Sequence, residues 1–318
     1  MISLKAIKAA SANISPSIHR TPIFSSRILS ERIGASLHLK CECFQKTGSF
    51  KPRGALNKIL SLSDAERAKG LITVSAGNHA QAVAWAAREV NAPCAVVMPT
   101  DAPGSKIDAV KEYQAEVILH PDRPTLFDKL NAEKDARGAT FVHPFDDPVL
   151  LAGSGTTGLE IMQDMPTADV VVVPVGGGGL LGGVTSAVKQ MNPATKVIAV
   201  ELEAGPGMKP ALAAGKPVPV SRPPTLADGM TPPFVGALPL QIVQEAVDDI
   251  VMVSEAEIIA AMKLLMTRCK LYVEASGAAA VAALLAGKIA IAPNANIVAI
   301  VSGGNIDLAQ ITQFVSPA

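Results

Sequence analysis

Predicted strands and helices alternate along most of this 318-residue sequence, and the alternation constrains the fold more than any other feature. Short apolar runs predict strands at 71–75, 94–98, 116–120, 140–142, 170–175, 196–201 and 297–301. Helical patterns lie between them, at 78–90, 105–114, 125–137, 156–165 and 181–190. Because strands joined by helices form parallel sheets with right-handed crossovers, the sequence predicts an α/β fold. Its sheets would be mostly parallel and flanked by helices.

The length favours two domains, since single hydrophobic cores stop growing at roughly 250–300 residues. Residues 64–147 have the size of a small domain, and 1–63 together with 148–318 would form a larger one. The stretch 205–239 is rich in proline and glycine, so we expect a long ordered loop there. Ser254 and Glu257 then have the spacing of a capping box, which predicts a helix to about 269. An alanine-rich helix is expected at 277–285.

Composition excludes several functions. Lys plus Arg equals Asp plus Glu at 28 each, and this balance argues against a nucleic-acid or anionic-membrane partner. Hydrophobic residues make up 49% of the chain, but no apolar run is long enough for a membrane span. Residues 1–8 lack the apolar core of a signal peptide, so the expected location is cytoplasmic. The four cysteines predict neither a disulfide framework nor a metal site.

Lys51 is the strongest candidate for a catalytic residue. It follows a Thr-Gly-Ser turn and precedes Pro52, and proline is favoured in the first turn of a helix. The positive end of the helix dipole disfavours the ammonium form of a lysine placed there. A neutral lysine amine can attack a carbonyl and hold it as a Schiff base. The alternative is a surface lysine beside a proline.

Three further segments each begin with a predicted strand and continue into a polar or glycine-rich turn. They are Ser75-Ala76-Gly77-Asn78-His79, Gly176-Gly177-Gly178-Gly179-Leu180 and Ser302-Gly303-Gly304-Asn305. A glycine run after a buried strand presents backbone N–H groups that can bind a phosphate. A nucleotide phosphate stays open as an alternative, because Glu201 ends the next strand. Asn78 could also be a simple helix cap.

Together with Lys51, these segments resemble the fold type II pyridoxal-phosphate (PLP) enzymes, with the tryptophan synthase β-like fold. The resemblance is specific to the threonine dehydratase and serine racemase group and extends from about His19 to the C-terminus. It implies PLP as the cofactor and a small-molecule amino acid as the substrate. It further implies that the cofactor is bound by Phe50, Lys51, Asn78, Gly176, Gly177, Gly178, Gly179, Leu180, Gly229 and Ser302. The substrate would be bound by Ser75, Ala76, Gly77, Asn78 and His79, with His79 as a supporting residue.

Two positions point to the reaction. The resemblance places Ser302 at the pyridine nitrogen of PLP, and a neutral hydroxyl cannot stabilise a pyridinium as an aspartate would. A weaker electron sink favours elimination of a β-substituent over transamination. Serine racemases carry a serine where this chain has Ala76, and an alanine cannot supply the second acid/base that racemisation needs. Ala76 therefore favours a dehydratase, in which Lys51 removes the Cα proton.

The chain departs from the family pattern at two positions. Glu201 matches a family ligand for a divalent cation, but Gly207 replaces the second ligand, so no metal site is expected. Ser154 stands where relatives commonly have glutamine, and it could enlarge the mouth of the active site for a bulkier β-substituent. Glu274 matches a glutamate near the cofactor, although a structural salt bridge is an equal alternative.

The sequence thus predicts β-elimination on a 3-hydroxy-amino acid such as L-threonine or L-serine, which gives a 2-oxo acid and ammonia. The alternatives are an amino-acid racemase, a dehydratase of a bulkier substrate such as phenylserine, and a β-replacement synthase. A non-catalytic PLP-binding or nucleotide-sensing protein is a fourth alternative, from another class of function. A homodimer is expected from the resemblance.

Overall fold

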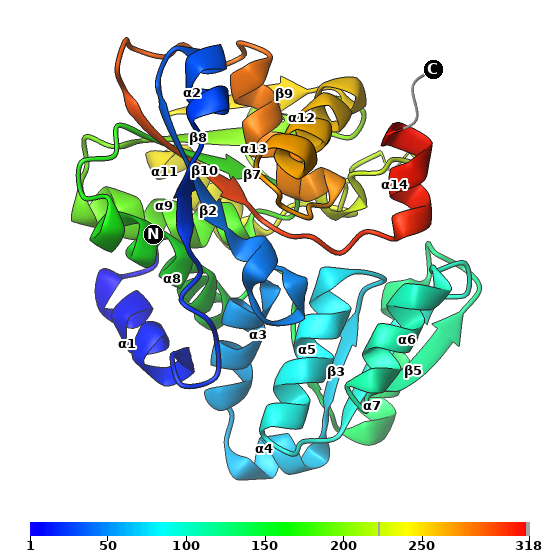
Figure 1. Cartoon of the computed structure of the whole chain (residues 1–318). Coiled ribbons are helices and arrows are strands. Elements are labelled where there is room, and N and C mark those ends of the chain that lie inside the picture. Colours follow the sequence, from blue (N-terminus) through cyan, green and yellow to red (C-terminus); the bar gives the residue numbers. More distant parts are fainter. Residues whose placement is uncertain (222, 316–318) are drawn as a thin grey trace.

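The computed structural model of the chain describes residues 1–221 and 223–315 and contains two β-sheets. In Figure 1 the six-stranded sheet occupies the upper half of the molecule, and the four-stranded sheet lies below it at the right. Eight of the strand pairings are between named strands, and all but the one at the edge of the larger sheet are parallel. The predicted α/β fold with mostly parallel, helix-flanked sheets is confirmed.

The four-stranded sheet has the strand order β5-β4-β3-β6. Its strands are β3 (Leu71–Val74), β4 (Cys94–Pro99), β5 (Glu116–His120) and β6 (Thr140–Phe141), and its helices are α4 (Asp64–Lys69), α5 (Asn78–Glu89), α6 (Gly104–Glu112) and α7 (Leu126–Arg137). Val96 and Met98 pack in one apolar cluster with alanines of α5. Val97 packs in a second cluster with Leu126 and Leu130 of α7. Since successive side chains of a strand point to opposite faces, β4 is buried between helices on both faces.

The six-stranded sheet has the strand order β1-β2-β10-β7-β8-β9. The strands are β1 (Ile23–Ser25), β2 (Ser36–Cys41), β7 (Val170–Pro174), β8 (Lys196–Leu202), β9 (Asp249–Val253) and β10 (Asn296–Val301). Val170 and Val172 pack in the core that includes α12 (Glu255–Arg268) and α13 (Ala275–Leu285). Val171 and Val173 pack on the opposite face against α9 (Gly179–Met191) and α11 (Ala237–Ala246). Both faces are covered, as a parallel sheet requires.

Two helices link the sheets. They are α3 (Lys51–Leu60) and α8 (Pro148–Asp164), which pack against each other and against α1 (Leu4–Ile14). We predicted that the second of these would start at 156, but it starts at Pro148, with the Asp147 side chain as its N-cap. The glycines and serine of its first turns are weak helix formers. They are present because α8 packs closely: a Cβ on Gly155 would lie only 2.9 Å from the carbonyl oxygen of Gly183.

The expectation of a loop at 205–239 is wrong in part. This stretch contains α10 (Met208–Ala214), the short 3₁₀ helix η3 (Asp228–Met230) and the start of α11. The first of these helices begins where the buried Glu201 carboxylate accepts hydrogen bonds from the backbone N–H groups of Gly207, Met208 and Lys209, at 2.8, 2.6 and 3.0 Å. Because the capping carboxylate of Glu201 comes from β8 and not from the residues next to α10, the sequence of 205–239 alone does not indicate where this helix begins.

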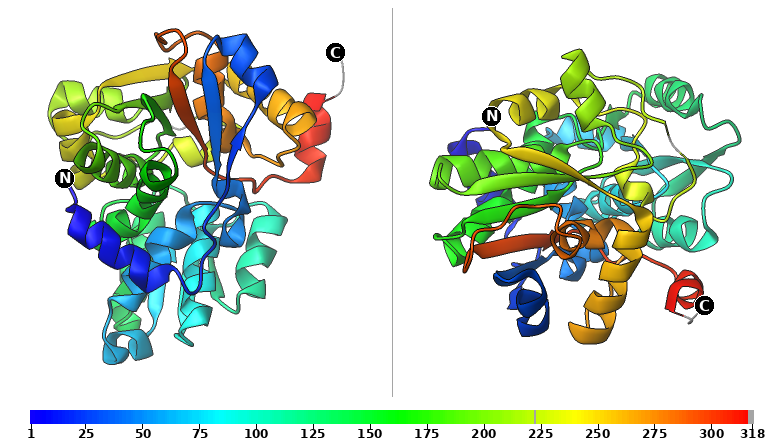
Figure 2. Two further views of the ribbon diagram at one scale, coloured as in Figure 1. Left: turned by 60° about the vertical axis from the view of Figure 1, so that its left-hand side comes forward. Right: turned by 90° about the horizontal axis from the view of Figure 1, so that it is seen from above.

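The capping box at Ser254 and Glu257 is confirmed at the start of α12. The remaining elements are α2 (Arg27–Ile33), the 3₁₀ helices η1 (Glu42–Phe44) and η2 (Lys46–Gly48), and α14 (Leu308–Val315). Helix α14 stands at the periphery in both views of Figure 2, apart from the sheets. Within the described part of the chain, no helix combines the length and the apolar character that crossing a bilayer demands.

Candidate active site

Lys51 lies at the start of α3, next to the end of β10. The backbone N–H of Phe50 donates to the carbonyl oxygen of Ser302 at 3.0 Å, and Ser49 forms an isolated bridge with Gly303. The Lys51 Nζ donates to the carbonyl oxygen of Pro144 at 3.0 Å and lies 5.1 Å from the centre of the Phe50 ring. Three predicted site residues, Phe50, Lys51 and Ser302, are therefore brought together by backbone contacts.

Burial makes the Lys51 amine reactive. It lowers the pKa of Lys51 to about 8, although the negative charge of Glu274 acts in the opposite direction. The sequence predicted the direction of this shift and assigned it to the helix dipole, whereas desolvation is the larger cause. Near pH 8, a large fraction of the amine is neutral and can act as a nucleophile or a base.

The glycine turn at 176–180 fits a phosphate group. In the described part of the chain, its backbone N–H groups donate to no other protein atom. Gly178 has φ +93°, a conformation that favours glycine, and a Cβ on Gly176 would overlap the carbonyl oxygen of Gly229. Free N–H donors at the start of α9, with the positive end of its dipole, form an anion-binding arrangement. Gly229 therefore lies beside the turn, as expected for a residue of the same site.

Ser302 fits a neutral ring nitrogen. It is 5% exposed at the end of β10, and its hydroxyl makes one long contact, 3.4 Å from the carbonyl oxygen of Ser276. A buried hydroxyl with such a weak partner is available as a hydrogen-bond donor to another acceptor. The unpaired backbone N–H groups at 176–180 can bind a phosphate, the Lys51 amine can bind an aldehyde, and the Ser302 hydroxyl can donate to a ring nitrogen. These three features together fit PLP.

Asn78 is held by two neighbours that come from the far end of the chain. Its Nδ2 donates to the Glu274 Oε1 at 2.6 Å, and its Oδ1 accepts from the Asn305 Nδ2 at 2.7 Å. Burial raises the pKa of Glu274 to about 7, and the negative charge of Asp228 adds to the shift. No lysine or arginine of the described chain forms an ion pair with Glu274. The alternative of a structural salt bridge is wrong, and Asn305 is a neighbour that the sequence did not predict.

The turn at 75–79 connects β3 to α5. Ser75 Oγ accepts a hydrogen bond from the backbone N–H of Gly77 at 3.1 Å, which shapes the turn. Ala76 packs against the apolar cluster of the small sheet and has no group that could carry a proton. His79 is buried, and its Nε2 lies 3.0 Å from the carbonyl oxygen of Val142. Burial, followed by the charge of Lys51, lowers its pKa well below the ordinary value.

The structure adds a segment that the sequence did not single out. Pro144 binds the Lys51 amine, and the ring of Phe145 occupies the space that a Cβ on Gly177 would need. These residues lie just before α8, far from Lys51 in sequence. The sequence carries no periodic signal there, so only the tertiary structure identifies the segment.

Two residues at which the chain departs from the family pattern have structural contacts. The Glu201 carboxylate caps the N-terminus of α10, and no group of metal-ligating side chains occurs among the described residues. Ser154 is 1% exposed and packs between α8 and α3, where its Oγ lies 3.0 Å from the position of a Cβ on Gly54. The expectation that Ser154 enlarges the mouth of the site is wrong, because the side chain is enclosed between two helices.

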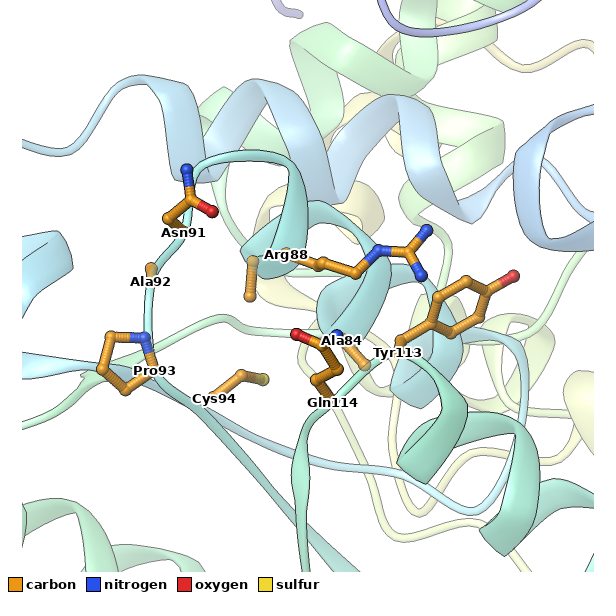
Figure 3. Close-up of a pocket in the computed structure, with 9 residues that line it drawn as sticks. Ala84, Arg88, Asn91, Ala92, Pro93, Cys94, Tyr113 and Gln114 are labelled. Atoms are coloured by element: carbon orange, nitrogen blue, oxygen red, sulfur yellow. The ribbon is translucent and has the colours of Figure 1, made fainter.

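A separate cavity of about 230 Å³ lies on the small-sheet side, at the end of α5 and the start of β4 (Figure 3). It is lined by Ala84, Ala87, Arg88, Asn91, Ala92, Pro93, Cys94, Tyr113 and Gln114. The turns around Lys51 lie at the carboxyl ends of the strands, where open α/β sheets bind ligands. This cavity lies at the opposite, amino end of its strand, so it is not part of the same site.

The fold and site define a PLP enzyme, and comparison with known proteins agrees. The family model described as pyridoxal-phosphate dependent enzyme matches residues 14–303, so the chain belongs to that family. The L-threonine ammonia-lyase of Thermotoga maritima is 45% identical, over 99% of this chain and 79% of that protein. A catabolic L-threonine dehydratase of Escherichia coli K12 is 43% identical, over 98% of this chain and 95% of that protein. The structure of maize serine racemase superimposes with a TM-score of 0.93 at 38% identity, over 98% of this chain and 96% of that one. The predicted resemblance to this group and the PLP cofactor are confirmed.

Proposed function

We propose that the chain is an ammonia-lyase that removes the β-hydroxyl of L-threonine or L-serine and yields a 2-oxo acid and ammonia. The observation that carries the proposal is that the site has a half-buried, partly neutral amine at Lys51, whereas the side chain of Ala76 has no group that can donate or accept a proton. The names of the relatives, two threonine ammonia-lyases or dehydratases and one serine racemase, support the same substrate class.

PLP would be held by the residues that the resemblance singled out. The free N–H groups at 176–180 would bind its phosphate, and the Ser302 hydroxyl would donate to its ring nitrogen. The second N–H of the Asn78 amide, which is not used by Glu274, would donate to the phenolic oxygen. When bound, PLP supplies an electrophilic carbonyl for Lys51 and a π-system that withdraws electrons from the substrate Cα.

The protein would contribute proton transfer and orientation. The Lys51 Nζ would accept the Cα proton of the substrate, because a base with a pKa of about 8 works close to physiological pH. The backbone N–H groups at the start of α5 would bind the substrate carboxylate, since the turn at 75–79 opens a helix N-terminus. Once released, the unsaturated product would hydrolyse in water to the 2-oxo acid and ammonia.

The decisive experiment incubates the purified PLP-loaded protein separately with L-threonine, L-serine and L-phenylserine. The 2-oxo acid and the D-enantiomer are measured in the same reaction. We expect 2-oxo acid from L-threonine or L-serine without D-enantiomer, and a Lys51→Ala protein should lose at least about 10³-fold in rate. Substantial D-enantiomer would favour the racemase instead, and product only from phenylserine would favour the bulkier substrate. A need for a second nucleophilic substrate would indicate a β-replacement synthase.

Three further expectations stay proposals: a cytoplasmic location, the division into domains 1–63 with 148–318 and 64–147, and a homodimer. Exposed Phe24 and Phe44 pack edge to face with centres 6.0 Å apart, beside a groove of about 500 Å³ that includes Ile28 and Cys269. An exposed apolar surface of this kind supports self-association. Light scattering after gel filtration should give twice the chain mass of 32.8 kDa, and a monomer would reject the homodimer.

A further inference from the structure

The segment 143–147, between β6 and α8, contacts several parts of the predicted active site. The carbonyl oxygen of Pro144 accepts from the Lys51 amine, and the Phe145 ring packs at the glycine turn. The Asp146 carboxylate accepts from the first backbone N–H groups of α11, and Asp147 caps α8. The conformation of this one turn therefore affects Lys51 and the phosphate-binding turn together.

His143 shapes the turn from within. Its Nδ1 accepts hydrogen bonds from the backbone N–H of Phe145 at 3.2 Å and from that of Asp146 at 2.9 Å. A ring nitrogen that accepts has no proton, so the proton of the imidazole is on Nε2 and the ring is neutral. The ring also packs edge to face on Phe145, with centres 4.8 Å apart, and contacts Phe141 on β6 at 5.3 Å.

The surroundings of His143 favour this neutral form. Burial lowers its pKa below the ordinary 6.5, and the positive charge of Lys51 acts in the same direction, whereas Asp146 and Asp147 oppose the shift. His79 is close enough for electrostatic interaction with His143, and its own pKa is lowered, mainly by burial. Because the folded pKa is depressed, the turn is fully supported above pH 6.5 and loses its support as the pH falls through the folded pKa.

We propose that His143 is a positioning residue for this active site. Its neutral imidazole holds the 143–147 turn so that the Pro144 carbonyl meets the Lys51 amine and the Phe145 ring backs the glycine turn. Protonation of Nδ1 removes the acceptor of two backbone N–H groups at once, and the turn then loses its shape. The proposal rests on the proposed roles of Lys51 and the glycine turn, but the test below does not need a substrate.

Two variants separate positioning from packing. His143→Asn keeps an acceptor, because an asparagine Oδ1 can bind the backbone N–H groups two and three residues later, and it does not titrate. His143→Ala removes the acceptor. The PLP dissociation constant of each protein is measured by absorbance titration between pH 5.5 and 8.5, with thermal unfolding as a check of folding. The ratio of variant to wild-type constants cancels the titration of the PLP phosphate, which all three proteins share.

At pH 8 we expect His143→Ala to bind PLP about tenfold more weakly or worse, and His143→Asn to stay within about threefold of wild type. As the pH falls through the depressed folded pKa of His143, the ratio for His143→Asn should fall, since only the wild type loses its acceptor. In the substrate assay the alanine variant should lose up to about 100-fold in kcat/KM, the scale of a small misplacement.

Three results would overturn the proposal: a His143→Asn ratio that does not change with pH, alanine binding equal to wild type at pH 8, or asparagine as weak as alanine. If the alanine variant does not fold, the pH dependence of the asparagine ratio still decides. A protein that binds PLP with these ratios but forms no 2-oxo acid would refute the proposed function and leave the role of His143 intact.

Discussion

At the scale of single residues, Lys51 owes its chemistry to its surroundings. Desolvation lowers its pKa to about 8, and Glu274, on the chain 223 positions later, partly compensates. Burial also raises the pKa of Glu274, to about 7.

This pKa predicts how the amine reacts in the PLP-free protein. Acetylation of Lys51 should increase with pH to a midpoint near 8, because only the neutral amine reacts. Peptide mapping after competitive labelling measures this, with the exposed Lys8 as an internal control. A midpoint for Lys51 above 10 would mean that the amine is not desolvated in solution.

Ala76 is the residue that we expect to suppress racemisation. Replacing it with serine should introduce a second proton donor, and D-serine formation from L-serine should rise about 10²-fold, the lower range for one acid/base group. Chiral chromatography of the reaction mixture measures the D-enantiomer. Ala76→Gly is the matched control, since it changes the size of the side chain without adding a hydroxyl. If both variants behave alike, the hydroxyl is not what separates the two reactions.

At the scale of elements, a buried ionic cluster fixes α3, and with it the backbone of Lys51. Arg53 is fully buried and binds Glu42 at 2.7 Å and Glu160 at 2.8 Å, and Lys40 binds Glu160 at 2.5 Å. These residues come from β2, η1, α3 and α8. Every charge in the cluster has a partner of opposite sign, which is the condition under which buried charges are tolerated.

Removing one member should therefore be costly. Glu160→Gln leaves Arg53 and Lys40 short of negative charge, and we expect a loss of about 3–5 kcal/mol in the free energy of unfolding. Burial alone would raise the pKa of Glu160, but Arg53 and Lys40 lower it, so the stabilisation is present above pH 4.5 and lost as the pH falls through the folded pKa. Urea unfolding at pH 7 and at lower pH measures both effects.

The exposed pair of Arg27 and Glu31, 3.6 Å apart on α2, is the control for that experiment. Glu31→Gln should change the free energy of unfolding by less than about 1 kcal/mol, as is typical of surface ion pairs. If Glu160→Gln and Glu31→Gln lowered the free energy of unfolding equally, the buried cluster would stabilise the protein no more than a surface ion pair does.

At the scale of the whole molecule, polar contacts near α6 add to the packing of α3 and α8 that links the two sheets. Lys106 on α6 forms an ion pair with Asp228 at 2.6 Å, and the neighbouring Ser105 donates to Asp307 at 3.0 Å. In Figure 1, α6 lies below α14, on the side where the two halves approach each other. Such partly exposed contacts are weak, so they can open and close at low cost.

We expect Lys106→Met to raise KM about two- to fivefold, the equivalent of up to about 1 kcal/mol, with kcat and thermal stability little changed. The ion pair is one of the contacts that would hold the small sheet against the large one around a bound substrate. Steady-state kinetics measures the effect. Lys111→Met, on the same helix and exposed, is the matched control. An equal KM in both variants would argue against a role of Lys106 in closure.

The sequence by itself determined the elements with strong local signals. The apolar runs of β7 and β10, the glycine run that follows β7, and the capping box of α12 are all local features of the sequence. Lys51 and the three turns were enough to recognise the family from the sequence, because their order along the chain is specific to it.

Only the tertiary structure decided which groups act on those turns. The contact of Lys51 with Pro144 spans 93 positions, and that of Asn78 with Glu274 spans 196. The use of Glu201 as a helix cap, the enclosure of Ser154 and the turn built by His143 also depend on which segments pack together. Burial and charge act through space, so the sequence placed the reactive residues, and the fold set their pKa values and their partners.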